Sequence, residues 1–442
     1  MKKKKKLLFV VLDGAADKPV KQYKRKTPFE VADTPNLDFL ALHGVTGKLD
    51  LLGKIPPETD SGVLALFGYD PFKRGRCRAV LEAYALGIPF EKGDVVMRGN
   101  FATVEDSYIV DVRAGRIPGK DAKKLIDDLN RQLELESWPV EARVYHTLNY
   151  RSILVLHPLK GKLSDQISNT HPAYLRKPKY VEIPVPVKGK MKLKKCRALD
   201  DKKMSKVTAK LVNEFTKKSI EILDSHRINE KRKKEGLLSA NGIILRAAGN
   251  ELPKLDNLEE KYGYSWFCLG DTPVERGIAK LLGMDLVEDL PELKMESLKK
   301  NASVEEIKKA VRKDMKIRVK KLFEVWDKYD AFYLHIKGAD PFGHAGRPEA
   351  KKAVIEALDE FLFGKILKNI DMDETIVCVT SDHTTACSAR AHTADPVPVV
   401  IAGDGFKPDN VKKFGENYFK KGKLGVMKAT KLLRLLMKKM GG

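Results

Sequence analysis

The apolar residues of the chain form uninterrupted runs in some places and helical repeats in others. Uninterrupted runs cover residues 7–12, 331–336, 375–380 and 397–402, which is typical of strands buried on both faces of a parallel sheet. Residues 303–326 and 353–367 repeat apolar positions at the spacing of a helix that buries one face. This alternation of strand and helix patterns predicts a doubly wound α/β domain.

Residues 88–251 show a different pattern of apolar and polar positions. Short β-like segments alternate there with helical stretches such as 122–133 and 207–223, and lysine and proline are dense around residues 177–195. We interpret this part as an inserted α+β domain, because it does not continue the alternation of buried strands and helices that predicts the parallel sheet. A chain of 442 residues is also too long for one ordinary domain. The sequence therefore predicts an α/β domain of residues 1–87 and 252–442, interrupted by an α+β domain of residues 88–251.

Side chains that can bind metal ions follow several of the predicted strands. They are Asp13, Asp340, His344, Asp382, His383 and His392. Because doubly wound sheets bind ligands at the carboxyl ends of their strands, we expect these side chains to gather at one edge of the sheet. We expect Asp340 and His344 to lie on a loop, since glycine and proline surround them. Carboxylates and imidazoles without cysteine suit Mn²⁺ or Zn²⁺ better than Mg²⁺ or Ca²⁺.

A turn rich in hydroxyl groups covers residues 56–62. Thr59 and Ser61 stand just before the apolar segment 63–67, at the mouth of a short predicted helix, where anionic groups are favoured. Taken alone, this turn reads as a plain helix cap. Beside two metal ions, one of its hydroxyls becomes a candidate nucleophile, because metal coordination activates a hydroxyl group.

The composition bears on the class of protein. The net charge of +23 includes lysine runs without interleaved aromatic residues, so a solvated surface is favoured and a basic nucleic-acid-binding protein is the non-enzymatic alternative. No apolar run approaches the roughly 20 residues that cross a bilayer, and the basic N-terminus leads directly into a strand pattern. The five cysteines show no C-x-x-C spacing. We expect a cytoplasmic protein with reduced thiols and no membrane partner.

Several motifs carry a family resemblance. They include Leu12-Asp13-Gly14, Glu58-Thr59-Asp60-Ser61, Leu66-Phe67-Gly68-Tyr69-Asp70-Pro71, Arg98-Gly99-Asn100, Asn149-Tyr150-Arg151, Gly343-His344 and Ser381-Asp382-His383. In this order they resemble the archaeal-type 2,3-bisphosphoglycerate-independent phosphoglycerate mutases, which belong to the alkaline phosphatase superfamily of two-metal enzymes. The resemblance covers nearly the whole chain.

This resemblance implies an alkaline-phosphatase-like core, an inserted domain that caps the substrate, and two divalent ions (Mn²⁺, Zn²⁺ or Co²⁺). It assigns one ion to Asp340, His344 and His392, and the other to Asp13, Asp382, His383 and the nucleophile. The implied reaction interconverts 3-phosphoglycerate and 2-phosphoglycerate in glycolysis and gluconeogenesis. It proceeds through a phosphorylated threonine or serine of the enzyme and needs no 2,3-bisphosphoglycerate.

Alternatives remain for the identity of the nucleophile and for the identity of the substrate. An alkaline-phosphatase register points to Ser61, whereas the mutase register points to Thr59, which we favour. The candidates for binding the substrate's carboxylate and phosphate by bidentate contacts are Arg113, Arg116, Arg151 and Arg246. Residues 284–300 and the pair at 15–16 depart from the family pattern, so a phosphohydrolase or another phosphomutase is the alternative activity. The expected partner is a small phosphorylated substrate rather than nucleic acid, with the oligomeric state open.

Overall fold

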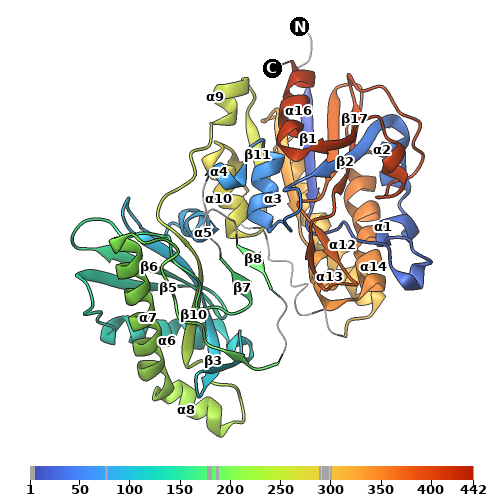
Figure 1. The fold of residues 1–442 in the computed structure, drawn as a ribbon. Helices are drawn as coiled ribbons and strands as arrows, with labels where there is room; N and C mark the ends of the chain where they lie inside the picture. Colours follow the sequence, from blue (N-terminus) through green and yellow to red (C-terminus); the bar gives the residue numbers. More distant parts are fainter. Residues whose placement is uncertain are drawn as a thin grey trace. The chain divides into compact units, whose positions relative to one another are not determined.

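The computed structural model describes residues 5–74, 78–176, 182–185, 189–287, 290, 298 and 301–441 (Figure 1). Contacts between residues divide the chain into two compact units. Unit 1 comprises Met1–Asp70 and Leu255–Gly442, and unit 2 comprises Pro71–Lys254. The N-terminal and C-terminal parts of the sequence therefore build one unit, and the middle of the chain builds the other.

Unit 1 contains an eight-stranded sheet with the strand order β12-β11-β13-β1-β14-β17-β2-β18. The strands are β1 (Lys6–Leu12), β2 (Gly44–Asp50), β11 (Trp266–Leu269), β12 (Asp285–Leu286), β13 (Ala331–Ile336), β14 (Thr375–Thr380), β17 (Val397–Gly403) and β18 (Gly425–Lys428). Strand β17 pairs antiparallel with β14 and β2, and the other pairs are parallel. Leu12 pairs with Ile336, and Val11 pairs with Thr380. The three central strands β13, β1 and β14 therefore end at nearly the same level.

Helices cover both faces of this sheet. They include α2 (Pro35–His43), α3 (Thr59–Leu66), α10 (Pro273–Leu281), α12 (Val304–Glu324), α14 (Pro348–Leu358) and α16 (Leu432–Met440). Leu8 and Val10 of β1 share a buried cluster with residues of α2, α12 and α14. The intervening Phe9 faces the opposite side, where its ring centroid lies 5.6 Å from that of Phe67, directly after α3. This arrangement confirms the predicted doubly wound α/β fold.

Unit 2 is an α+β unit built on an antiparallel sheet. Its main elements are β3 (Val95–Glu105), β4 (Tyr108–Asp111), β5 (Val140–Leu148), β6 (Arg151–Pro158), β9 (Met191–Lys192), β10 (Gly242–Gly249), α5 (Arg78–Ala85), α6 (Gly119–Gln132) and α7 (Lys203–Asp224). Strand β3 pairs with β4, β6 and β10. Alternate β3 residues such as Val95 and Met97 are buried with apolar residues of α6 and α7. Helix α5 packs on β3 and β10, so residues 78–85 belong to unit 2 although the sequence boundary was expected at residue 87.

Some local expectations need correction. Asp340 and His344 lie on a short helix, α13 (Asp340–Ala345), and the expected loop is wrong. Pro341 is compatible with a helix because it occupies the first turn, and Gly346 ends the helix in the left-handed conformation. The cysteines at positions 196, 268, 378 and 387 are free and buried, while Cys77 lies outside the described residues. In the part of the chain that the structure describes, every helix is too short or too polar to cross a membrane.

Candidate metal centre

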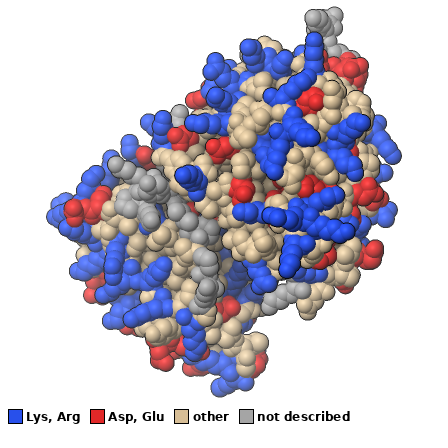
Figure 2. Space-filling model, turned by 45° about the vertical axis from the view of Figure 1, so that its right-hand side comes forward, with Lys and Arg blue, Asp and Glu red and all other residues tan. Residues whose placement is uncertain are grey.

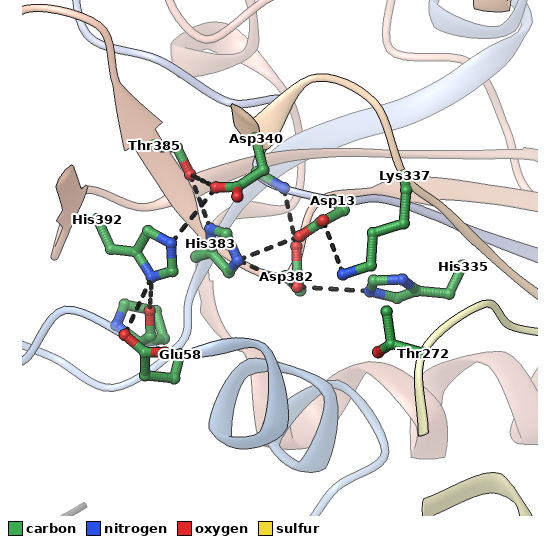
Figure 3. A network of polar contacts seen from close by, with 12 residues as sticks. Asp13, Glu58, Thr272, His335, Lys337, Asp340, Asp382, His383, Thr385 and His392 are labelled. Atoms are coloured by element: carbon green, nitrogen blue, oxygen red, sulfur yellow. Dashed lines mark hydrogen bonds and ion pairs between the residues drawn. The ribbon is translucent and has the colours of Figure 1, made fainter. Parts of the chain in front are cut away.

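Three neighbouring strands deliver the predicted ligands to one edge of the sheet in unit 1. Asp13 follows β1, Asp340 follows β13, and Asp382 and His383 follow β14. His392 comes from β16 (Ala391–Thr393), which forms a hairpin with β15 (Thr384–Ala386) beside them. Figure 3 shows these side chains pointing toward one another. The structure thus brings the predicted ligand residues together at the place that the strand pattern indicated.

The first set of ligand atoms comes from Asp13, Asp382 and His383. The Nε2 atom of His383 lies 3.2 Å from Oδ1 of Asp13 and 3.3 Å from Oδ2 of Asp382. All three atoms are buried, and none has a hydrogen-bond partner among the described residues. A tetrahedral metal site with bonds of about 2.0–2.1 Å separates its ligand atoms by about 3.4 Å. The spacing and the unsatisfied atoms therefore fit a bound divalent cation.

The second set comes from Asp340, His344 and His392. Oδ1 of Asp340 lies 3.4 Å from Nε2 of each histidine, and the two Nε2 atoms lie 3.1 Å apart. The Nδ1 atom of His344 contacts the backbone carbonyl of Arg390 at 3.1 Å, and Nδ1 of His392 contacts that of Pro57 at 2.8 Å. Because a carbonyl only accepts hydrogen bonds, both Nδ1 atoms carry the proton. In the neutral rings the Nε2 lone pairs then converge with the carboxylate, as metal ligands do.

The charge around His392 also favours a cation. Burial lowers the pKa of His392, but the nearby carboxylates of Asp340 and Glu58 outweigh it and raise the pKa to about 9. The site therefore stabilises positive charge at Nε2, which either a proton or a metal ion can supply.

His383 connects the two sets. Its ring stacks on that of His392 with centroids 3.8 Å apart. Ligand atoms of Asp340, His383 and His392 also lie within 4.8 Å of one another, as do those of Asp13, Asp382 and His383. The family resemblance assigned His383 to one ion alone, whereas in the structure this side chain lies within reach of both sets.

Lys337 and His335 lie next to carboxylates of the first set, and neither was predicted to have a role there. Nζ of Lys337 lies 2.8 Å from Oδ2 of Asp13 and 2.9 Å from Oε1 of Glu275. Nε2 of His335 lies 3.4 Å from Oδ2 of Asp382 (Figure 3). Its Nδ1 atom lies 3.3 Å from Oε1 of Glu275. The buried Glu275 of α10 is therefore linked to two metal-ligand carboxylates.

Lys337 also determines the charge state of Asp13. Burial by itself raises the pKa of the Asp13 carboxyl, but the Lys337 ammonium outweighs burial and holds that pKa well below its usual value. Burial lowers the pKa of Lys337, yet Asp13 and Glu275 raise it above its usual value. Asp13 is consequently ionised and able to bind a cation. A charged residue directly after β13 was the sequence signal for Lys337, whereas Glu275 reads in the sequence only as a helix-capping residue.

The hydroxyl turn lies against this centre. A Cβ atom added at Gly62 of α3 would lie 2.0 Å from the backbone carbonyl oxygen of Asp382, so the helix approaches the metal-ligand turn as closely as only glycine permits. Thr59 stands three residues before Gly62 and therefore shares its helix face. The Ser61 hydroxyl bonds to the backbone of Glu58, whereas Thr59 makes no hydrogen bond through its side chain with the described residues.

Arginines gather separately in unit 2. Buried Arg98 of β3 lies 3.2 Å from Glu82 of α5, and the charges of Arg78, Arg151 and Arg246 also act on Glu82. Burial and the neighbouring arginines lower the pKa of Arg98 to about 9, so it remains protonated at neutral pH. These four arginines outnumber the two carboxylates that pair with them, Glu82 and Glu182, which favours binding of an anion.

The four predicted arginines occupy different positions in this unit. Arg246 pairs with Glu182 and stacks on Tyr174, with 3.8 Å from its guanidinium carbon to the ring centroid. Arg113 and Arg151 lie over the ring of Tyr150 at 5.7 Å and 5.6 Å. Arg116 is exposed. Arg98 was not among the predicted arginines, although it stands in the Arg98-Gly99-Asn100 motif.

Comparison with known proteins identifies a family of similar sequences. A family model described as 2,3-bisphosphoglycerate-independent phosphoglycerate mutase matches residues 41–229. The mutase 1 of that name from Archaeoglobus fulgidus is 37% identical over 439 residues, covering 98% of this chain and 97% of the relative. The mutase from Ignicoccus hospitalis is 36% identical over 443 residues, covering 98% and 97%.

Two solved structures match over nearly the full length. A Pyrococcus horikoshii protein has a TM-score of 0.76 at 28% identity, covering 99% of this chain and 98% of the other. The cofactor-independent phosphoglycerate mutase from Thermoplasma acidophilum has a TM-score of 0.60 at 28% identity, covering 99% and 100%. Similarity of this extent places the protein among the isomerases. The chain belongs to the 2,3-bisphosphoglycerate-independent phosphoglycerate mutase family.

Proposed function

We propose that the protein interconverts 3-phosphoglycerate and 2-phosphoglycerate in glycolysis and gluconeogenesis with two divalent metal ions and a phosphorylated Thr59. The observation that carries this proposal is the pair of ligand sets with converging lone pairs and unsatisfied carboxylate oxygens, next to the face of α3 that presents Thr59. Family membership supports the reaction, and the geometry supports its location in unit 1.

Each ligand set would hold one ion. Asp13, Asp382 and His383 would bind the first, and Asp340, His344 and His392 the second. Bound divalent ions would lower the pKa of the attacking hydroxyl and neutralise charge on the phosphoryl group. The ligand chemistry suits Mn²⁺, Zn²⁺ or Co²⁺.

The transfer proceeds in two steps that balance. Oγ1 of Thr59 forms a bond to phosphorus as the bond from phosphorus to the C3 oxygen of 3-phosphoglycerate breaks, and the hydroxyl proton passes to that oxygen. The C2 hydroxyl oxygen of the retained glycerate then forms a bond to phosphorus as the bond from phosphorus to Oγ1 breaks, and the C2 hydroxyl proton passes to Oγ1. The N-terminus of α3 stabilises the negative charge on the phosphorylated side chain. Because the phosphoryl donor is the substrate itself, no 2,3-bisphosphoglycerate is required.

The arginine cluster of unit 2 is our candidate for binding the substrate's anionic groups. Arg98, Arg151 and Arg246 surround a face of the sheet on which positive charge exceeds negative charge. Guanidinium groups bind carboxylate and phosphate through paired hydrogen bonds. We also propose that unit 2 caps the substrate and excludes water, which would suppress hydrolysis of the phosphoenzyme.

An enolase-coupled assay tests the proposal. Metal-loaded protein given 3-phosphoglycerate, without 2,3-bisphosphoglycerate, should form 2-phosphoglycerate, and chelation should abolish turnover. The Thr59→Ala variant should lose turnover by several orders of magnitude while it keeps its metal content, and phosphopeptide mapping of the wild type should find phosphate on Thr59. Phosphate on Ser61 would reassign the nucleophile.

Two other activities give different results. A phosphohydrolase would release free phosphate without forming 2-phosphoglycerate, which a phosphate-detection assay run in parallel would record. A nucleic-acid-binding protein would bind DNA or RNA with steep salt dependence and would be unaffected by Thr59→Ala. Figure 2 shows Lys and Arg spread over the visible face among Asp and Glu, which favours a solvated surface over a nucleic-acid groove.

A further inference from the structure

Thr385 occupies a central position behind the candidate metal centre. It lies on β15 and is fully buried. Its hydroxyl donates a hydrogen bond to Oδ1 of Asp340 at 2.7 Å and lies 2.9 Å from Nδ1 of His383 (Figure 3). One hydroxyl group therefore contacts a ligand residue of each set.

The direction of these two hydrogen bonds follows from the chemistry of the groups. An ionised carboxylate only accepts, so the single hydroxyl hydrogen of Thr385 is directed to Asp340. The Thr385 oxygen can then only accept from His383, so Nδ1 of His383 must carry a proton. In the neutral ring the lone pair is consequently on Nε2, the atom that faces Asp13 and Asp382 at 3.2 Å and 3.3 Å. Thr385 thereby selects the tautomer of His383 that can bind a metal ion.

Surrounding residues hold Thr385 in this place. Its backbone N–H donates to the carbonyl of Ala16 at 3.0 Å, and its own carbonyl accepts from Nζ of Lys351 at 2.7 Å. Lys351 is fully buried and pairs with Asp17 at 2.8 Å. The threonine position is thus fixed by backbone contacts rather than by its hydroxyl alone.

Two glycines make room for the Thr385 side chain and backbone. A Cβ atom at Gly14 would lie 2.5 Å from the Thr385 hydroxyl oxygen, and one at Gly343 would lie 2.6 Å from the Thr385 carbonyl oxygen. These glycines directly follow Asp13 and directly precede His344, which are ligand residues of different sets. The packing therefore places Thr385 between the two sets.

We propose that Thr385 is a positioning residue that couples the two metal sites: it fixes the His383 tautomer and orients the Asp340 carboxylate. This inference rests on the proposed metal-dependent function. Partners that orient a metal ligand typically contribute 10–100-fold to metal affinity, so removal of the hydroxyl should weaken both sites by about that factor.

The test compares Thr385→Val with Thr385→Ser and Thr384→Val. Valine keeps the shape and removes the hydroxyl, serine keeps the hydroxyl, and Thr384 of the same strand donates to the carbonyl of Asp395 instead. Zn²⁺ and Mn²⁺ affinities are measured by calorimetry with a competing chelator, and metal-free thermal unfolding monitors the fold. We expect Thr385→Val to weaken binding about 10–100-fold, with Thr385→Ser and Thr384→Val close to wild type.

Histidine ¹⁵N NMR of the zinc-loaded proteins supplies a second readout. In wild type and Thr385→Ser, His383 should show a protonated Nδ1 and a metal-bound Nε2, and in Thr385→Val this signal should weaken or shift. Unchanged affinity and tautomer in Thr385→Val would overturn the role of Thr385. Absence of metal binding in the wild type would instead overturn the proposed metal-dependent function, so the two failures are distinguishable.

Discussion

The Ser61 hydroxyl accepts a hydrogen bond from the backbone N–H of Glu58 at 3.0 Å and donates one to the carbonyl of the same residue at 2.9 Å. Both bonds lie in the first turn of α3, where backbone N–H groups lack partners within the helix. Ser61 therefore has a structural task that its neighbour Thr59 lacks. The roles of the Ser61 and Thr59 hydroxyls can therefore be distinguished by experiment.

The Ser61→Ala variant should lose stability and retain turnover. It leaves the buried N–H of Glu58 without its acceptor, which costs about 1–3 kcal/mol. Thr59→Ala should show the opposite: little change in the free energy of unfolding and no turnover. Urea unfolding of the metal-free proteins and the enolase-coupled assay measure the two quantities. Loss of turnover in Ser61→Ala with unchanged stability would assign the nucleophile to Ser61.

The positions of the metal ligands were largely predictable from the sequence. Asp13 and Asp382 follow apolar runs long enough to be buried strands, and the carboxyl ends of neighbouring strands meet at one edge. The resemblance added the division between two ions. The role of each ligand residue stays a prediction that the metal-binding experiments test.

Other features depended on tertiary contacts that no local pattern encodes. Glu275 stands in a Thr-x-x-Glu pattern and caps α10, as that pattern predicts. It also pairs with Lys337, which follows β13 and is distant in the sequence. Thr385 is one of several threonines near β14, and only the hairpin places its hydroxyl between Asp340 and His383. The glycine-containing strand β2 lacks a strong apolar pattern, and its pairing with β17 and β18 stabilises it instead.

Replacement of Lys337 by methionine should destabilise the metal-free protein. The substitution leaves the carboxylates of Asp13 and Glu275 buried without their shared cation, and breaking a buried ion pair costs about 3–5 kcal/mol. Denaturant unfolding in the presence of a chelator measures this loss. The partly exposed pair of Lys5 and Asp404 provides a control, since Lys5→Met should cost at most about 1 kcal/mol.

A second substitution checks the cause of that loss. In Lys337→Met/Glu275→Gln one of the two uncompensated carboxylates is removed, so the double variant should be more stable than Lys337→Met. Additive losses from the two single substitutions would contradict an ion-pair role for Lys337.

Glu416 should make stability depend on pH near neutrality. Burial raises its pKa from 4.5 to about 7, against hydrogen bonds from Thr27 and the backbone of Asp17 that lower it. Between these values the folded state binds more protons at this position than the unfolded state, so the free energy of unfolding falls as pH rises. The slope contributed by one such group is at most about 1.4 kcal/mol per pH unit.

The Glu416→Gln variant isolates this contribution, because the amide has nearly the same shape and does not titrate. The stability difference between wild type and Glu416→Gln should be nearly constant below pH 4.5 and should shift against the wild type between pH 4.5 and about 7. Chemical unfolding at closely spaced pH values measures it. The charges of Glu30 and Lys48 also interact with Glu416. Glu305→Gln on the exposed first turn of α12 controls for the loss of one negative charge. A flat difference across this range would show that Glu416 is ionised in the folded protein.

Metal stoichiometry should distinguish His383 from His344. A ligand atom of His383 lies within 4.8 Å of ligand atoms from both sets, whereas Nε2 of His344 lies next to Asp340 and His392 of the second set. His344→Gln should therefore retain one ion per chain, and His383→Gln should retain less than one, compared with two in the wild type. Elemental analysis after gel filtration in metal-free buffer measures these numbers. The exposed His43 lies on α2, so His43→Gln should retain both ions. Retention of one full ion by His383→Gln would show that the two sites bind their ions independently.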